Sequence, residues 1–136
     1  MKTLQAALEY IAILGVVLAF IIPLWVYTIS LYQQTNTELS LSYAENAVKQ
    51  IADTASLVYS QGPPAKVSLR VYIPVGVVNI TMVNTTIIFN VSTPFGYTNV
   101  FAISDAKLNG SIPTEEGYYL LSIEAKNDYV EIRAVQ

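Results

Sequence analysis

The sequence predicts an α+β protein, in which a long apolar N-terminal α-helix precedes a small antiparallel β-sandwich or barrel. Of its 136 residues, 53% are hydrophobic and only 12% are charged, about half of the roughly 25% charge that is usual in a soluble domain. No charged residue lies between Glu9 and Glu38, whereas short runs of β-branched and aromatic residues follow Lys66. The division we expect is a helical part, 1–61, and a β domain, 62–136.

The composition excludes most catalytic and binding chemistries. The chain has no Cys and no His, so disulfides, thiolates and imidazole bases are absent. Its net charge is −3 and it contains no run of basic residues, so it has no cluster of Lys and Arg that would bind nucleic-acid phosphates. The pair Glu115-Glu116 is interpreted as solvated loop charge, because no spacing typical of a metal or catalytic site surrounds it. We therefore predict no enzyme, no catalytic or metal-binding residue and no cofactor.

The run from Tyr10 to Tyr32 predicts a membrane-spanning helix. Its length of about 35 Å at 1.5 Å per residue exceeds the roughly 30 Å of a bilayer core. Trp25, Tyr27 and Tyr32 suit a membrane boundary at its far end. With Lys2 before the run, the N-terminus is expected in the cytoplasm and the rest outside. A cleaved secretory signal fits less well, because the run is long and no small-residue cleavage site follows it.

A second apolar pattern continues the helix beyond the uncharged run. Apolar residues spaced three and four apart form one stripe: Leu41, Ala44, Val48, Ile51, Ala55 and Val58. The helix is therefore expected from about residue 3 to about residue 60, where Gln61-Gly62-Pro63-Pro64 ends it. At Pro23 we expect a kink or an unwound turn, or alternatively a proline tolerated in a membrane helix.

From Lys66 onward the pattern predicts strands of a small sandwich or barrel. Turn residues separate them, among them Pro94-Phe95-Gly96 and Asn109-Gly110. The apolar stripe of the helix is expected to cover one side of the sheet. The predicted strands are Val67–Ile73, Val75–Thr81, Thr85–Val91, Thr98–Ser104, Tyr118–Ala125 and Tyr129–Val135.

Gln5-Ala6-Ala7-Leu8-Glu9-Tyr10, followed by an apolar helix, resembles the class III signal motif of archaeal type IV pilins and archaellins. The stretches 62–67 and 72–77 also resemble the start of such a pilin's β domain. The resemblance implies a type IV pilin-like fold with an Ig-like head and processing between Leu4 and Gln5. It also implies that Glu9 neutralises a neighbour's N-terminal amine or helix amides and sets the register of assembly. The alternative places Glu9 among lipid headgroups, where it complements its own helix dipole.

The resemblance implies a homopolymer whose apolar helices leave the membrane and pack into a filament core. Packing some 15 large apolar side chains would contribute on the order of 20 kcal/mol per subunit before entropic costs. Assembly would need a membrane platform, a cytoplasmic ATPase and a prepilin peptidase. The residues expected to pack in the core are Leu14, Gly15, Leu18, Ile22, Pro23 and Trp25, of which Gly15 with Ala19 has small-xxx-small spacing.

Four sequons for N-linked glycans lie in the second half of the chain, at Asn79, Asn84, Asn90 and Asn109. On the expected topology all four face outside, where glycans would shield a domain with few charges. The alternative is that strands rich in Asn and Thr produce sequons by chance.

The resemblance therefore implies a structural subunit of an extracellular archaeal type IV pilus-like filament that serves surface adhesion. The nearest alternative is an archaellin, the same architecture used for motility. The second is a monomeric membrane-anchored module that binds a sugar or a partner protein at the cell surface. An extracellular enzyme is a distant third.

Overall fold

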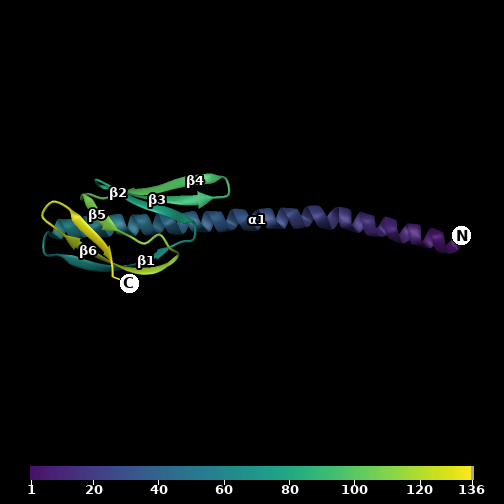
Figure 1. The fold of residues 1–136 in the computed structure, drawn as a ribbon, viewed down its shortest axis with the longest axis horizontal. Helices are drawn as coiled ribbons and strands as arrows, with labels where there is room; N and C mark the ends of the chain where they lie inside the picture. The colour runs from purple at the N-terminus through teal and green to yellow at the C-terminus, as the bar shows by residue number, and fades with distance from the viewer. Residues whose placement is uncertain (136) are drawn as a thin grey trace. The chain divides into compact units, whose positions relative to one another are not determined.

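A computed structural model describes residues 1–135 and contains one long helix and seven strands (Figure 1). The chain forms two compact units, 1–36 and 37–136. The helix contributes to both units, so this division falls inside the helix and not at its end. The elements are α1 (Lys2–Gln61), β1 (Lys66–Ile73), β2 (Val77–Val83), β3 (Thr86–Thr93), β4 (Gly96–Ile103), β5 (Leu108–Ser111), β6 (Gly117–Ala125) and β7 (Val130–Ala134).

The helix begins and ends close to where the sequence predicts. Gly62 follows the last helical residue with a φ of 73°, and its amide donates a hydrogen bond to the carbonyl of Tyr59. This left-handed glycine satisfies a carbonyl of the last turn, and the prolines after it cannot continue the helix. Pro23 lies inside α1, which remains helical through it. The expectation of an unwound turn at Pro23 is therefore wrong.

The strands form two separate sheets and no closed barrel. One sheet has the order β1-β6-β7-β5 and the other the order β2-β3-β4. All neighbouring strands are antiparallel except β5 and β7, which are parallel. The expectation of a wholly antiparallel domain is wrong at this pair, because β5 reaches β7 by a crossover through β6. The two sheets meet where the amide of Leu108 donates to the carbonyl of Asn84.

Two details of the strand prediction are also wrong. Asn109-Gly110 lies within β5 and is not a turn, since a short strand there pairs with β7. β2 begins at Val77 and not at Val75, because Gly76 adopts a φ of 94° in a turn. The carbonyl of Gly76 accepts a hydrogen bond from the amide of Ser92 and fixes this turn against β3.

The second unit has one hydrophobic core, to which the end of α1 and both sheets contribute. In Figure 1 β2, β3 and β4 lie on one side of this part of α1, and β1 and β6 on the other. The predicted stripe is confirmed: all of its members are buried except Leu41, which is partly buried, and Ala47 and Ala52 widen it. The Ser56 hydroxyl accepts a hydrogen bond from the Asp105 amide and lies 3.2 Å from the Ser104 hydroxyl.

Candidate membrane and assembly helix

The first unit, 1–36, consists of the N-terminal part of α1, which we call the apolar segment. None of its residues is buried or half-buried in this chain, although most are apolar. Phe20 is 75% exposed and Trp25 67% exposed. Exposed apolar surface on this scale is characteristic of a membrane-facing helix or an interaction surface.

By length and composition α1 is able to cross a membrane. The core helix of a soluble protein can be equally apolar, but such a helix is mostly buried, whereas the most apolar stretch of α1 is not buried at all. A signal sequence near the N-terminus would also be apolar and exposed. In this chain α1 continues from the apolar stretch to Gln61, and its last turns lie in the core of the second unit.

Four of the six residues predicted to pack in a filament core lie on one face of α1. At about 100° per residue, Leu14, Leu18, Ile22 and Trp25 fall within about 80° of one another around the helix axis. All four are exposed. The apolar segment therefore presents a continuous row of large side chains that has no partner among the described residues of this chain.

The other two predicted packing residues lie at the edge of this face and behind it. Gly15 stands beside the row, and a Cβ placed on it would meet nothing within 4 Å. In the isolated chain Gly15 therefore has no packing reason to be a glycine. Pro23 lies on the opposite side and cannot donate an amide hydrogen to the carbonyl of Ala19. The carbonyl of Leu24, the residue after Pro23, accepts a hydrogen bond from the Thr28 hydroxyl.

Glu9 is exposed and forms no ion pair or side-chain hydrogen bond within the described residues, 1–135. It lies seven residues after Lys2, where α1 begins, and the first turn contains no acidic residue. The Leu4-Gln5 peptide bond precedes Glu9 and lies within α1.

The four sequons lie on different parts of the β strands. Asn79 on β2 is exposed, and its amide donates to the hydroxyl of Thr81 in the same sequon. Asn84 is exposed in the turn between β2 and β3, with a φ of 52°. Asn109 is exposed on β5, whereas Asn90 on β3 is half-buried and its Oδ1 atom has no hydrogen-bond partner among the residues described. Three of the four sequons are therefore accessible.

Charged side chains concentrate on the outer face of the four-stranded sheet. Glu124 and Lys126 form an ion pair of 2.6 Å, and Lys126 also lies 3.8 Å from Glu131. Glu131 in turn accepts a hydrogen bond of 2.9 Å from Arg133. The hydrogen bond lowers the pKa of Glu124 and raises the pKa of Lys126, and burial opposes both shifts. The opposite charges of this group thus neutralise one another, an arrangement that suits structural pairing better than catalysis.

An aromatic cluster beside this sheet was not predicted. The Tyr72 ring lies 5.5 Å from the ring of Tyr43 on α1 and 4.9 Å from that of Tyr118 on β6. The Tyr72 hydroxyl donates to Glu116, and this hydrogen bond raises the pKa of Tyr72. Arg70 lies over the Tyr118 ring. The cluster ties α1 to the sheet edge. The register of β1 against β6 brings Tyr72 and Tyr118 together, and the packing of α1 adds Tyr43.

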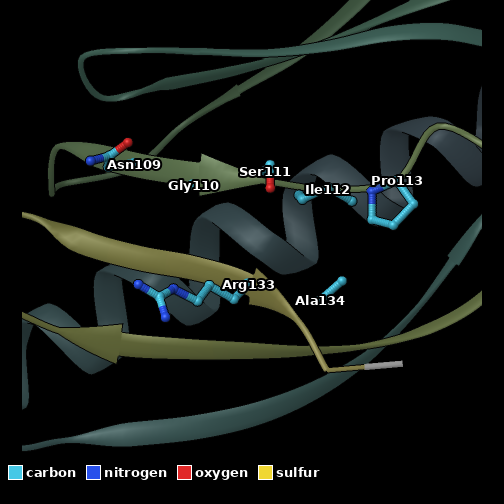
Figure 2. A pocket seen from close by; sticks show the side chains of 7 residues that line it. All are labelled: Asn109, Gly110, Ser111, Ile112, Pro113, Arg133 and Ala134. Carbon is cyan, nitrogen blue, oxygen red and sulfur yellow. The ribbon is translucent and has the colours of Figure 1, made fainter.

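A shallow groove lined by β5, the two residues that follow it and the end of β7 offers no catalytic arrangement (Figure 2). Its lining residues are Asn109, Gly110, Ser111, Ile112, Pro113, Arg133 and Ala134. Arg133 is the ionisable residue among them, and it is paired with Glu131. Glu115 and Glu116 lie before β6 and outside this groove. Within residues 1–135, no three acidic side chains lie close enough together to hold a metal ion.

Comparison of the chain with protein-family models, curated proteins and solved structures finds no match. The features that bear on function are therefore the exposed apolar segment, its unpaired Glu9 and the folded β unit into which the same helix continues.

Proposed function

We propose that this chain is a structural subunit of an extracellular type IV pilus-like filament, built by packing the apolar segments of many copies. The observation that carries the proposal is that one helix combines two environments. Its second part is buried in a folded β unit, while its first part exposes every apolar side chain. Such a segment needs an apolar environment both in the membrane and after leaving it, and a bundle of identical segments supplies the second.

Glu9 supports a polymer over a simple membrane anchor. An unpaired carboxylate next to an apolar span is costly in hydrocarbon, so it requires a partner there. The chain provides none among its described residues. In a polymer the partner is the N-terminal amine or the free helix amides of a neighbouring copy, which gives assembly a fixed axial register.

The further parts of the proposal follow from this architecture. Before assembly the subunit resides in the membrane with its N-terminus in the cytoplasm. After processing between Leu4 and Gln5, an assembly platform and an ATPase extract it from the membrane. In the filament the β units lie outside and carry glycans at accessible sequons. The filament serves adhesion, without catalysis, metal or nucleic acid.

The test is Glu9→Ala in the full-length chain, with Glu45→Ala as the matched control. Glu45 is also an exposed glutamate of α1, but it lies in the part of the helix that packs on the β unit. Glu9→Ala is expected to abolish filaments while leaving the chain in the membrane, and Glu45→Ala is expected to leave filaments intact. Electron microscopy of sheared surface material measures both. Normal filaments from Glu9→Ala would contradict the assigned role of Glu9, and wild-type cells without filaments would contradict the function itself.

A further inference from the structure

The two sheets differ sharply in charge. No Asp, Glu, Lys or Arg lies between Arg70 and Asp105, a stretch that includes all of β2, β3 and β4. The four-stranded sheet instead carries Lys66, Arg70, Glu124, Glu131 and Arg133. Solvent-facing sheets normally carry charges that keep them soluble and stop their edges from pairing. The outer face of β2-β3-β4 lacks this protection.

The register of the three strands defines this surface, which we call the uncharged face. Ile87, Phe89 and Val91 on β3 are buried, so the alternate residues of β3 and their partners face outward. Three cross-strand rows follow, namely Val83-Thr86-Ile103, Thr81-Ile88-Phe101 and Asn79-Asn90-Asn99.

The uncharged face combines an apolar end with a row of amides. Ile103 is 68% exposed and Phe101 64% exposed, and Val83 is exposed beside them. In the middle of the amide row, the Oδ1 atom of Asn90 is buried and has no hydrogen-bond partner within residues 1–135. On either side of it, the exposed side-chain amides of Asn79 and Asn99 offer carbonyl oxygens that can accept hydrogen bonds from outside the chain. The face therefore fits a partner that is apolar, uncharged and equipped with hydrogen-bond donors.

This chain carries a second surface with those properties. The stretch 10–37 of α1 has no charged residue, and its exposed Trp25, Tyr27 and Tyr32 combine apolar rings with N–H and O–H donors. Interface cores are depleted in charge and enriched in such aromatic residues. We propose that the uncharged face of one copy packs on the Trp25–Tyr32 stretch of α1 in a neighbouring copy. The contact rests on the proposed function, because filament assembly is what brings copies together.

The geometry of such a contact agrees with a polymer. The two surfaces differ, so each copy keeps one of each kind unoccupied after pairing. Heterologous contacts of this type repeat into open helical assemblies when they do not close into a ring. The contact also covers an uncharged sheet surface that would otherwise associate without specificity.

A consequence concerns the sequons. Asn79 and Asn90 lie within the uncharged face and would carry no glycan in the filament. Asn84, in the turn, and Asn109, on the other sheet, lie outside the contact and remain open to modification. Glycans on Asn79 or Asn90 would therefore indicate that no neighbour covers the uncharged face. Glycans on Asn84 and Asn109 alone are what the contact predicts.

Disulfide trapping tests the contact directly, because the chain has no native Cys. The test variant combines Phe101→Cys with Tyr27→Cys, and the matched control combines Leu120→Cys with Tyr27→Cys. Leu120 is an exposed apolar residue whose strand belongs to the charged sheet. Mild oxidation of filaments is expected to convert the test variant into covalent dimers and longer ladders, and to leave the control monomeric. Equal cross-linking in both variants, or none in the test variant, would overturn the proposed contact.

A charge placed on the uncharged face provides a second measurement. Phe101→Glu is expected to lower the amount of surface filament by more than about tenfold, since burying an unpaired charge is strongly unfavourable. Leu120→Glu is expected to change it little. The melting temperature of each variant in detergent distinguishes a loss of assembly from a loss of folding. If Phe101→Glu does not fold, the disulfide test alone decides whether the contact exists.

The outcomes also separate this contact from the proposed function. If wild-type filaments form but Phe101→Glu assembles normally, or if glycopeptide mass spectrometry finds glycans on Asn79 or Asn90 in filaments, the contact is wrong and the function stands. If wild-type cells form no filament, the function itself is wrong.

Discussion

The two parts of α1 share one helix but differ in what surrounds them. In 37–61, apolar residues such as Val48 and Ile51 are fully buried against the sheets, and charged residues such as Glu45 and Lys49 are exposed. In 1–36, apolar residues cover the whole circumference and none is buried. A one-sided stripe is typical of a helix on the surface of a domain, whereas a helix that is apolar all round requires lipid or other helices. The difference shows which partner each part needs.

The largest effect is expected from a substitution that destabilises the unit in which 37–61 is buried. Gly110 on β5 has a φ of 140°, and a Cβ there would overlap the carbonyl oxygen of Ile132 on β7. Gly110→Ala is therefore expected to destabilise the β unit by about 4 kcal/mol, from backbone strain and a forced displacement of β7. Thermal unfolding in detergent, followed by near-ultraviolet circular dichroism, measures the loss.

Gly96→Ala is the matched control for this change. Gly96 has a φ of 132°, but a Cβ there would meet nothing within 4 Å. We expect it to cost only the backbone term, about 1–2 kcal/mol. Equal destabilisation by the two variants would contradict the close approach of β5 to β7.

The second prediction compares equivalent truncations in the two parts of α1. Ile51→Ala removes a fully buried side chain and is expected to destabilise the monomer in detergent by about 3 kcal/mol. Leu18→Ala removes an exposed one and is expected to change monomer stability by less than about 0.5 kcal/mol. Filament resistance to heat is expected to fall in Leu18→Ala. Filaments of Leu18→Ala as heat-resistant as wild type would contradict packing through this face.

The third prediction concerns the contact that ties α1 to the edge of β1. Tyr72→Phe keeps the ring contact with Tyr43 but removes the hydrogen bond to Glu116. We expect only a small loss in the free energy of unfolding, because the bond is exposed to solvent. Tyr72→Ala removes the ring as well and is expected to cost more. Chemical denaturation in detergent measures both, and a larger loss in Tyr72→Phe than in Tyr72→Ala would contradict this role of the ring contacts.

The smallest effect is expected from pH. The pKa of Glu124 is lowered from its ordinary value of 4.5, so its pairing stabilises the fold above about pH 4.5 and is lost as the pH falls through the lowered pKa. The pKa of Lys126 is raised from 10.5, so its contribution is present below that pH and is lost as the pH rises through the raised pKa. Glu124→Gln should therefore flatten the acid end of the melting-temperature profile slightly. An unchanged acid profile would contradict this role of the pair.

The sequence predicts correctly those features that depend on residues close together in the chain, namely the buried face of α1 and the residue at which α1 ends. The spacing of Ala44, Val48, Ile51, Ala55 and Val58 predicts the buried face of α1, because helical periodicity alone decides which residues share a face. The capping signal at Gly62 predicts the helix end for the same reason.

Features that depend on non-local pairing were missed. β5 is only four residues long and contains an Asn-Gly pair that usually marks a turn, and its parallel pairing with β7 is set by tertiary contacts. The row Asn79-Asn90-Asn99 also exists only through strand register, and the cluster at Tyr72 needs both strand register and the packing of α1. The absence of charge from 71 to 104 was the available signal for the uncharged face, and it becomes informative once the register shows which residues point outward.

The measurement that tests the filament proposal most directly is cryo-electron microscopy of filaments sheared from the cell surface. We predict a core of packed helices that begins at Gln5 and includes the rest of the apolar segment, with the β units outside and a neighbour's amine or helix amides next to Glu9. If the chain is absent from every filament and remains in the membrane as a monomer, the apolar segment is an anchor and the filament proposal is contradicted.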